Sequence, residues 1–195
     1  MTEFIESGMS FKLSDDNCFR IEEHKLVRKT VKHSTQNLKA CEFVSYVNNR
    51  HVFVEAKSSA PKGPAGKVED LKLNGKSMPA NWTAYDNFTS YLRDITKKFV
   101  DSYNILRSIS EGYHGAEEKG ELKLPNKNIS SEKIEFVLIL NLPSDAGNTK
   151  RESLANLRDA LTNEMRPFLS IWNISSDAIK VCWPEQACAR YGFPA

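Results

Sequence analysis

The chain has 195 residues, of which 40% are hydrophobic, and its 27 basic and 25 acidic side chains leave a formal net charge of only +2. So small a net charge is not typical of a dedicated nucleic-acid-binding protein. No uncharged apolar stretch reaches the roughly 18 residues that a membrane span requires, and the first residues lack the basic and apolar regions of a signal peptide. We therefore expect one soluble, cytoplasmic domain over residues 1–195 with no membrane partner.

The segment before residue 40 contains two predicted strands and a basic stretch. Residues 10–13 and 18–22 are the strand segments, and a turn over residues 14–17 separates them, so that they supply an edge or first strand of a sheet. Residues 24–41 contain no acid, and their potentially basic side chains are His24, Lys25, Arg28, Lys29, Lys32, His33 and Lys39. Such a stretch is either a contact surface for nucleic-acid phosphates or simply a solvated basic face.

Residues 41–59, CEFVSYVNNRHVFVEAKSS, predict a tight β-hairpin. β-branched and aromatic residues, which suit a pleated surface, dominate both halves of this segment. Asn48 and Asn49 separate the halves, and asparagine tolerates the positive φ angles of a two-residue primed turn. With this pair as the loop, the numbers of opposed residues sum to 97 (47 + 50), which places Glu42 opposite Glu55.

The predicted register creates a candidate metal site on one face of the hairpin. Opposed carboxylates repel each other, and a Mg²⁺ ion, which takes oxygen ligands, would offset the repulsion between Glu42 and Glu55. The two-residue period of a strand puts Lys57 on the same face as Glu55. An ammonium group there could orient a metal-bound water or stabilise charge that develops on a phosphate. The other interpretation of Glu55 and Lys57 is an ordinary alternation of charges on the solvated face of a strand.

The remaining elements follow from composition and periodicity. Residues 58–80 contain three prolines, three glycines and the basic residues Lys62, Lys67, Lys72 and Lys76, and they predict a long loop directly after Lys57. Apolar residues at three- and four-residue spacing predict a helix over residues 82–110, with Asn81 as a possible N-cap. Residues 133–142 predict a strand buried on both faces, and a turn follows at residues 143–147. A second helix over residues 150–171, kinked or shortened by Pro167, and a strand over residues 179–183 complete the chain.

The order of strands, long helix, strand, helix and strand predicts an α/β domain in which helices flank both sides of a central mixed sheet. The hairpin resembles the PD-(D/E)xK, or restriction-endonuclease-like, nuclease superfamily, which places an acid in one strand and E-x-K in the next. The resemblance implies that Glu42 and Glu55 are the catalytic acids, that Lys57 is the catalytic lysine, and that the backbone carbonyl of Ala56 is a further metal ligand. Two departures are that the first acid is Glu rather than Asp and that Cys41 replaces a common proline. Glu22 and Glu23 are candidates for an additional upstream acid.

Two functions are therefore expected. The first is a Mg²⁺- or Mn²⁺-dependent nuclease that cleaves DNA or RNA. The second is a catalytically inactive protein with the same fold that acts as a nucleic-acid or protein interaction module. The sequence leaves the oligomeric state open.

Overall fold

The computed structural model describes residues 2–25, 27–28, 38–61, 82–126, 128–141 and 147–193. Its centre is a five-stranded mixed sheet with the strand order β3-β4-β5-β6-β7. The strands are β3 (Cys18–Phe19), β4 (Phe43–Val47), β5 (Arg50–Lys57), β6 (Ile134–Leu140) and β7 (Ile179–Cys182). The pairings β3–β4 and β4–β5 are antiparallel, whereas β5–β6 and β6–β7 are parallel. The predicted mixed α/β architecture is confirmed.

The hairpin of β4 and β5 has the predicted turn and register. Asn48 and Asn49 have φ angles of 52° and 61°, as a primed two-residue turn requires. Val47 faces Arg50, and the ladder continues to the pair of Phe43 and Val54. The register that the asparagine pair predicts is therefore confirmed along the whole of β4.

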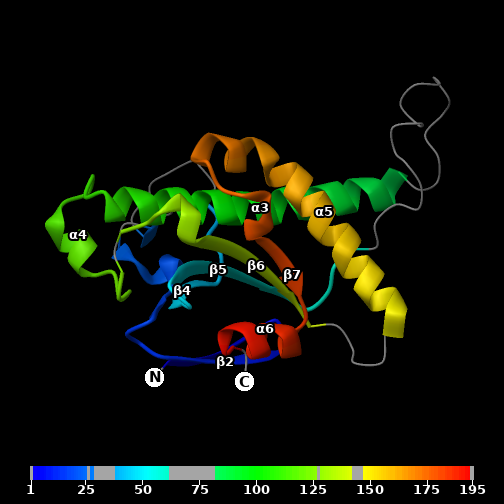
Figure 1. Ribbon diagram of the computed structural model, residues 1–195, viewed down its shortest axis with the longest axis horizontal. Coiled ribbons are helices and arrows are strands. Elements are labelled where there is room, and N and C mark those ends of the chain that lie inside the picture. Colours follow the sequence, from blue (N-terminus) through cyan, green and yellow to red (C-terminus); the bar gives the residue numbers. More distant parts are fainter. Residues whose placement is uncertain are drawn as a thin grey trace.

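Two long helices, α3 (Trp82–Ser110) and α5 (Gly147–Trp172), cover one face of the sheet (Figure 1). The bounds of α3 are those predicted, while α5 begins three residues earlier than predicted. Pro167 lies inside α5 without ending it, because the helix continues to Trp172. Apolar side chains of both helices pack on the sheet and form one core cluster, which includes Phe53, Leu92, Ile95, Phe99, Phe136, Leu157, Leu161 and Met165.

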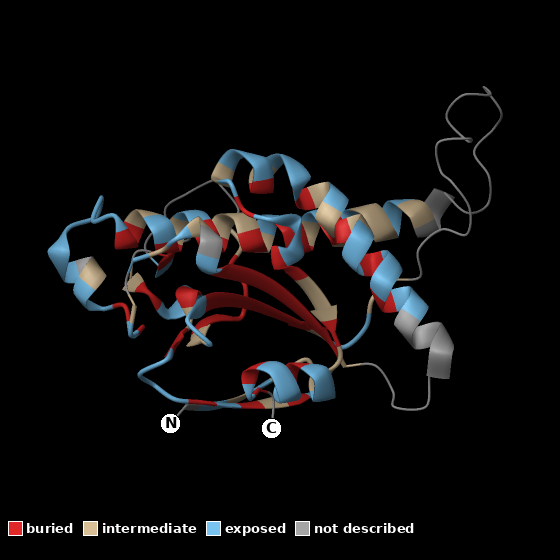
Figure 2. Cartoon of the chain, viewed as in Figure 1, coloured by how far each residue is buried: buried red, intermediate tan, exposed pale blue. Residues whose placement is uncertain are grey.

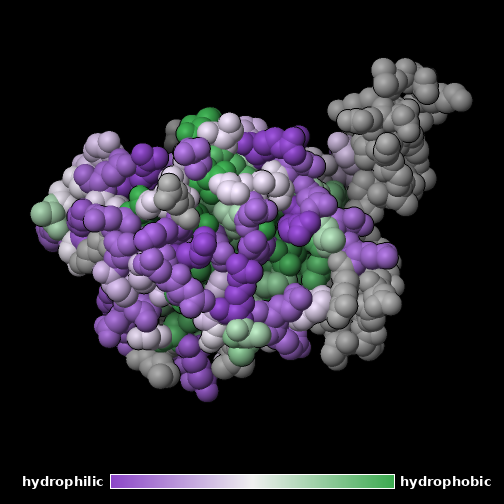
Figure 3. Space-filling view, viewed as in Figure 1, coloured by the Kyte–Doolittle hydropathy of each residue, from purple (hydrophilic) through white to green (hydrophobic). Residues whose placement is uncertain are grey.

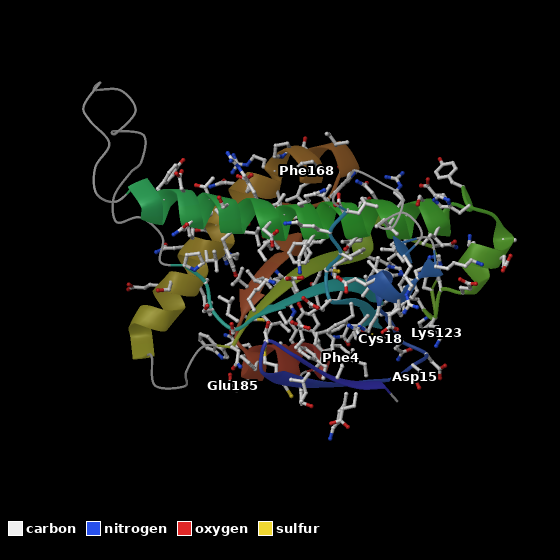
Figure 4. All side chains as sticks on the ribbon, turned by 180° about the vertical axis from the view of Figure 1, so that it is seen from behind. Phe4, Asp15, Cys18, Lys123, Phe168 and Glu185 are labelled. Atoms are coloured by element: carbon white, nitrogen blue, oxygen red, sulfur yellow. The ribbon has the colours of Figure 1, made fainter. Side chains whose placement is uncertain are left out.

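The opposite face of the sheet is covered differently from the prediction. A separate two-stranded sheet, β1 (Thr2–Glu6) and β2 (Met9–Leu13), lies there together with the short helix α6 (Pro184–Tyr191). Phe4 of β1 stacks on Phe11 at 5.3 Å between ring centroids and meets Phe43 edge-on at 5.7 Å (Figure 4). The prediction that residues 10–13 join the central sheet is therefore wrong, whereas the predicted helices on both faces are present, with α6 sharing the second face with β1 and β2.

The central strands are enclosed by these two layers. All seven residues of β6 are buried. Figure 2 shows the buried strands between the two long helices and the lower layer, which consists of β1, β2 and α6. Of the segment predicted as a strand over residues 18–22, only β3 forms, and the 3₁₀ helix η1 (Ile21–Glu23) follows it. Further elements of the described part are the short helix α4 (Ala116–Gly120) and the 3₁₀ helices η2 (Ser131–Lys133) and η3 (Ser176–Ala178).

Some predicted features lie outside the described residues. These are most of the predicted loop over residues 58–80 with its four lysines, Asn81, and most of the turn after β6. Within the described part, none of the helices is long and apolar enough to cross a membrane.

Candidate active site

The candidate site lies where the parallel strands β5 and β6 end. Glu55 and Lys57 lie within the last three residues of β5. The backbone N–H of Asn141, directly after β6, donates to the Lys57 carbonyl at 2.8 Å. The Glu55 side chain has no exposed surface, whereas that of Lys57 is 29% exposed. The Lys57 ammonium lies 2.8 Å from Oε1 of Glu55. The E-x-K residues therefore form an ion pair in which the carboxylate is buried and the ammonium group is partly exposed to solvent.

Glu42 reaches the same place, although its backbone departs from the predicted pairing. Its N–H donates to the Val54 carbonyl at 3.0 Å, and the chain bends at this residue. Val54 already faces Phe43 in the ladder, so Glu42 does not take the ladder position directly opposite Glu55. The prediction of direct opposition is therefore wrong in backbone register, because the regular ladder stops one residue short of Glu42.

A lysine of α3 brings the two carboxylates together. The Nζ of Lys98 lies 2.7 Å from Oε1 of Glu55 and 3.4 Å from Oε1 of Glu42. The Lys98 side chain is 16% exposed and that of Glu42 is 10% exposed, so the cluster is largely withdrawn from solvent. The two glutamates and two lysines have a formal charge sum of zero. The repulsion expected between the acids is thus offset here by ammonium groups of the chain itself.

Burial and neighbouring charges shift the protonation of this cluster. Burial, followed by the charge of Glu55, raises the pKa of Glu42 from 4.5 to about 7, although Lys98 opposes the shift. Burial also raises the pKa of Glu55, against the combined effect of Lys98 and Lys57. Burial alone would lower the pKa of Lys98, but Glu55 and Glu42 outweigh it and raise that pKa. Lys98 therefore stays charged, whereas the raised pKa of Glu42 makes this carboxyl group titrate close to neutral pH.

The two oxygens of the Glu55 carboxylate differ in their contacts with the described residues. Oε1 accepts from both lysines, whereas Oε2 is buried and has no hydrogen-bond partner among the described residues. The hydroxyl of Tyr91, about two turns before Lys98 on α3, is also buried without a partner in the described part. Burial and then the Glu55 charge raise the pKa of Tyr91. An unpaired buried carboxylate oxygen is costly and marks a place where a water or an ion completes the site.

The turn between β1 and β2 adds further groups at this edge. The Ser7 hydroxyl donates to the Ala56 carbonyl at 2.9 Å, and the Asn141 side-chain amide donates to the Ser7 carbonyl at 3.1 Å. Ser7 itself has a φ of 52°. The neighbouring Glu6 contributes to the raised pKa of Glu42, so its charge acts on the site. The Ala56 carbonyl, which the resemblance implies to be a metal ligand, thus accepts one hydrogen bond from the protein itself.

The upstream acids proposed from the sequence have another environment. Glu22 and Glu23 are exposed on η1, and Glu23 pairs with Arg20 at 3.0 Å. Glu23 lines a cleft of about 400 Å³ at the end of the molecule where Figure 4 shows Asp15 and Lys123. The upstream acid whose charge raises the pKa of Glu42 is Glu6.

The oxygen groups at this site fit a hard divalent ion such as Mg²⁺ only if water molecules supply further ligands. In the described ranges, no group of three or more His, Cys, Asp and Glu side chains gathers as a metal site. Two carboxylates with a carbonyl and several waters are nevertheless an adequate set for Mg²⁺, which retains part of its hydration shell. The observation that favours such an ion is that Oε2 of Glu55 has no partner within the described part of the chain, and the position of Lys98 is the observation that opposes it.

The basic stretch before the hairpin is partly neutralised. Lys25 pairs with Glu117 at 2.8 Å and with Glu121 at 2.9 Å, and Lys39 pairs with Asp94 of α3. His24 is buried, with Nε2 at 3.5 Å from the Glu121 carboxylate. These contacts favour a structural role for Lys25 and Lys39. Lys29, Lys32 and His33 lie outside the described residues.

A second polar cluster lies at the opposite end of the parallel strands. Both oxygens of the buried Glu135 are paired, one with Arg190 at 2.8 Å and the other with the Tyr191 hydroxyl at 2.6 Å. Glu135 and Arg190 line a cleft of about 630 Å³.

Figure 3 shows apolar side chains at the surface over β7, between α5 and α6, where Leu154 and Val181 line a smaller hollow of about 230 Å³.

Lys98, Tyr91 and Glu6 are the site residues that the sequence analysis missed. Lys98 follows the buried Ile95 by three positions and precedes the buried Ser102 by four, so it lies on the apolar face of α3. A lysine on the buried face of an amphipathic helix was the available signal. Glu6 offered none, because β1 was not predicted.

No known family model matches this chain, and a search of solved structures finds no match either.

Proposed function

We propose that the chain has a restriction-endonuclease-like fold and is a cytoplasmic, Mg²⁺- or Mn²⁺-dependent nuclease that hydrolyses phosphodiester bonds of DNA or RNA. The order of the hairpin β4–β5, α3, β6, α5 and β7 agrees with the order that the resemblance implies. The observation that carries the proposal is that Glu42 and Glu55 converge on one cation, with Lys57 beside them, at the carboxyl ends of parallel strands. Ligands of open α/β sheets bind at such ends.

Each residue has a defined role in this proposal. Glu42, Glu55 and the Ala56 carbonyl would hold the ion, which when bound would polarise a phosphoryl oxygen and acidify a water. Lys57 is the half-exposed member of the cluster, so its ammonium can contact a phosphate or orient the attacking water from the solvent side. Glu6 adds negative charge next to Glu42, which favours a cation there.

The test is cleavage of supercoiled plasmid, single-stranded DNA and RNA with Mg²⁺ or Mn²⁺. Lys57→Ala should lose at least a hundredfold in rate, because it removes a group that acts on the reacting phosphate. Lys12→Ala is the matched control, since Lys12 is an exposed lysine of β2 that pairs with Glu3 at 3.5 Å. Equal cleavage by wild type and Lys57→Ala would mean that the activity has another source.

The second candidate function is a catalytically inactive interaction module for nucleic acid or protein. The observation that favours it is that Lys98 and Lys57 together neutralise the two acids without any metal. Under this alternative, Mg²⁺ and Mn²⁺ at millimolar concentration would leave the thermal unfolding midpoint unchanged, because a ligand that does not bind the native state cannot stabilise it.

A further inference from the structure

The ammonium of Lys98 takes a position that a shared metal ion would need. A single Nζ lies within 3.4 Å of an oxygen from each glutamate, and it approaches from α3, opposite the strand that carries Glu55. Lys57 is placed differently, because it contacts Glu55 from the same strand and is more exposed. Of the two lysines, Lys98 is therefore the one that bridges both acids.

We propose that Lys98 is a displaceable internal counter-ion, which occupies the cation position of the metal-free protein and leaves the carboxylates when a divalent ion binds. The inference rests on the proposed assignment of Glu42 and Glu55 as the metal ligands. It adds a function for a residue that neither the E-x-K motif nor the resemblance includes.

Charge balance requires the exchange. With Lys98 in place, two carboxylates already face two ammonium groups, so a divalent ion would add two positive charges to a neutral cluster. Like charges at contact distance in a partly buried site repel each other strongly, and a divalent ion doubles the repulsion that each ammonium group experiences. Departure of Lys98 relieves that repulsion and leaves Oε1 of Glu55 with Lys57 alone, beside an Oε2 that has no partner among the described residues.

The side chain of Lys98 has the means to leave. It is 16% exposed, so its path to solvent is short, and a lysine carries its charge on a flexible four-carbon stem. Since the metal must compete with a tethered ammonium, Lys98 lowers the metal affinity and sets the ion concentration at which the site fills. Removal of the ammonium should therefore tighten metal binding.

The first experiment is isothermal titration calorimetry of Mn²⁺ and Mg²⁺ into wild type, Lys98→Met and Lys97→Met. Lys97→Met is the matched control, because the neighbouring Lys97 is an exposed lysine of the same helix that pairs with Asp101 at 2.7 Å. We expect Lys98→Met to bind Mn²⁺ at least tenfold more tightly than wild type, and Lys97→Met to bind like wild type. Equal or weaker binding by Lys98→Met would overturn the inference, since Lys98 would then hold the acids in place for the ion.

A second measurement is made on the wild-type protein and covers the case in which Lys98→Met fails to fold. The side-chain ammonium signal of Lys98 in isotope-labelled wild type, assigned with Lys98→Arg, should shift or disappear through exchange with water as Mg²⁺ is added. A Lys98 signal that is unchanged when calorimetry shows the site saturated, or an absence of any metal binding, would overturn the inference.

The outcomes separate the inference from the proposed function. Tighter metal binding by Lys98→Met without cleavage by any variant would leave the inference standing and remove the nuclease proposal. Metal-dependent cleavage that requires Lys57, together with unchanged or weaker binding by Lys98→Met, would leave the nuclease proposal standing and remove the inference.

Discussion

The ion pair of Glu55 and Lys98 should contribute much more to stability than an equally short pair on the surface of the same helix. At 2.7 Å and an effective dielectric constant of about 20, the gross Coulomb attraction is about 6 kcal/mol. Desolvation removes most of this, and Lys57 still pairs with Oε1 of Glu55 when Lys98 is absent. Breaking a buried pair costs about 3–5 kcal/mol, while exposed pairs couple by about 0.2–1 kcal/mol. We expect a coupling energy of about 2 kcal/mol for this partly buried pair.

A double-mutant cycle measures that coupling. Glu55→Gln, Lys98→Met and the double variant are unfolded with urea in metal-free buffer, and the free energies of unfolding are compared with wild type. The matched cycle uses Arg107→Met and Glu111→Gln of the same helix, whose ion pair has the same 2.7 Å distance but with side chains that are 46% and 37% exposed. We expect the surface pair to couple by less than about 1 kcal/mol. If the Glu55–Lys98 coupling is no larger than that of the surface pair, burial of the cluster does not strengthen it and the reasoning is refuted.

Two further predictions concern Glu42 and the hairpin turn. The pKa of Glu42 is raised from 4.5 to about 7, so the folded protein holds an extra proton between these values. The stability that this proton confers is complete below pH 4.5 and is lost as the pH rises through about 7. Wild type should lose about 1–2 kcal/mol more than Glu42→Gln between pH 5 and 8 in urea unfolding, after allowance for solvent screening. Parallel pH profiles would contradict the raised pKa. Asn49 has a φ of 61°, so Asn49→Ala should cost about 1–2 kcal/mol and Asn49→Gly less than half as much. Equal urea midpoints for both variants would show that the turn imposes no such constraint.

The hairpin was predictable because its information is local. Strand-forming residues flank an asparagine pair, and the sign of φ at two positions fixes the register of every pair up to Phe43 and Val54. The long helix α3 was predictable for a similar reason, since its apolar period persists over 29 residues. Both elements carry their own signal before any tertiary contact forms.

The lower layer was not predictable in the same way. Helix α6 has only eight residues, which is shorter than the window over which a helical period can be recognised. Its identity depends on Pro184 at its start and Gly192, with a φ of 78°, at its end. Strand β1 is five residues long, and one of the ring contacts that hold it is between Phe4 and Phe43, which is distant from Phe4 in sequence.

The composition of the site was only half predictable. Glu42, Glu55 and Lys57 follow from strand period and turn geometry, but Lys98 depends on how α3 crosses the sheet. In the sequence, Lys97 and Lys98 are adjacent and chemically identical, yet one pairs with Asp101 at the surface and the other with buried Glu55. The angle around the helix axis, rather than residue type, separates the two roles.

Two buried glutamates on neighbouring strands show why the Glu55 end of the sheet, rather than the Glu135 end, is the better candidate for chemistry. Both oxygens of Glu135, at the start of β6, accept hydrogen bonds, one from Arg190 at 2.8 Å and one from Tyr191 at 2.6 Å. This is expected of a carboxylate that holds α6 on the sheet. Glu55 at the end of β5 gives one oxygen to two lysines and leaves the other unpartnered among the described residues. A carboxylate selected only for stability would be expected to satisfy both oxygens, because an unpaired one costs about 1–3 kcal/mol or more. The uncompensated oxygen of Glu55 therefore argues for a group that binds there, and local violations of packing rules of this kind concentrate at functional sites.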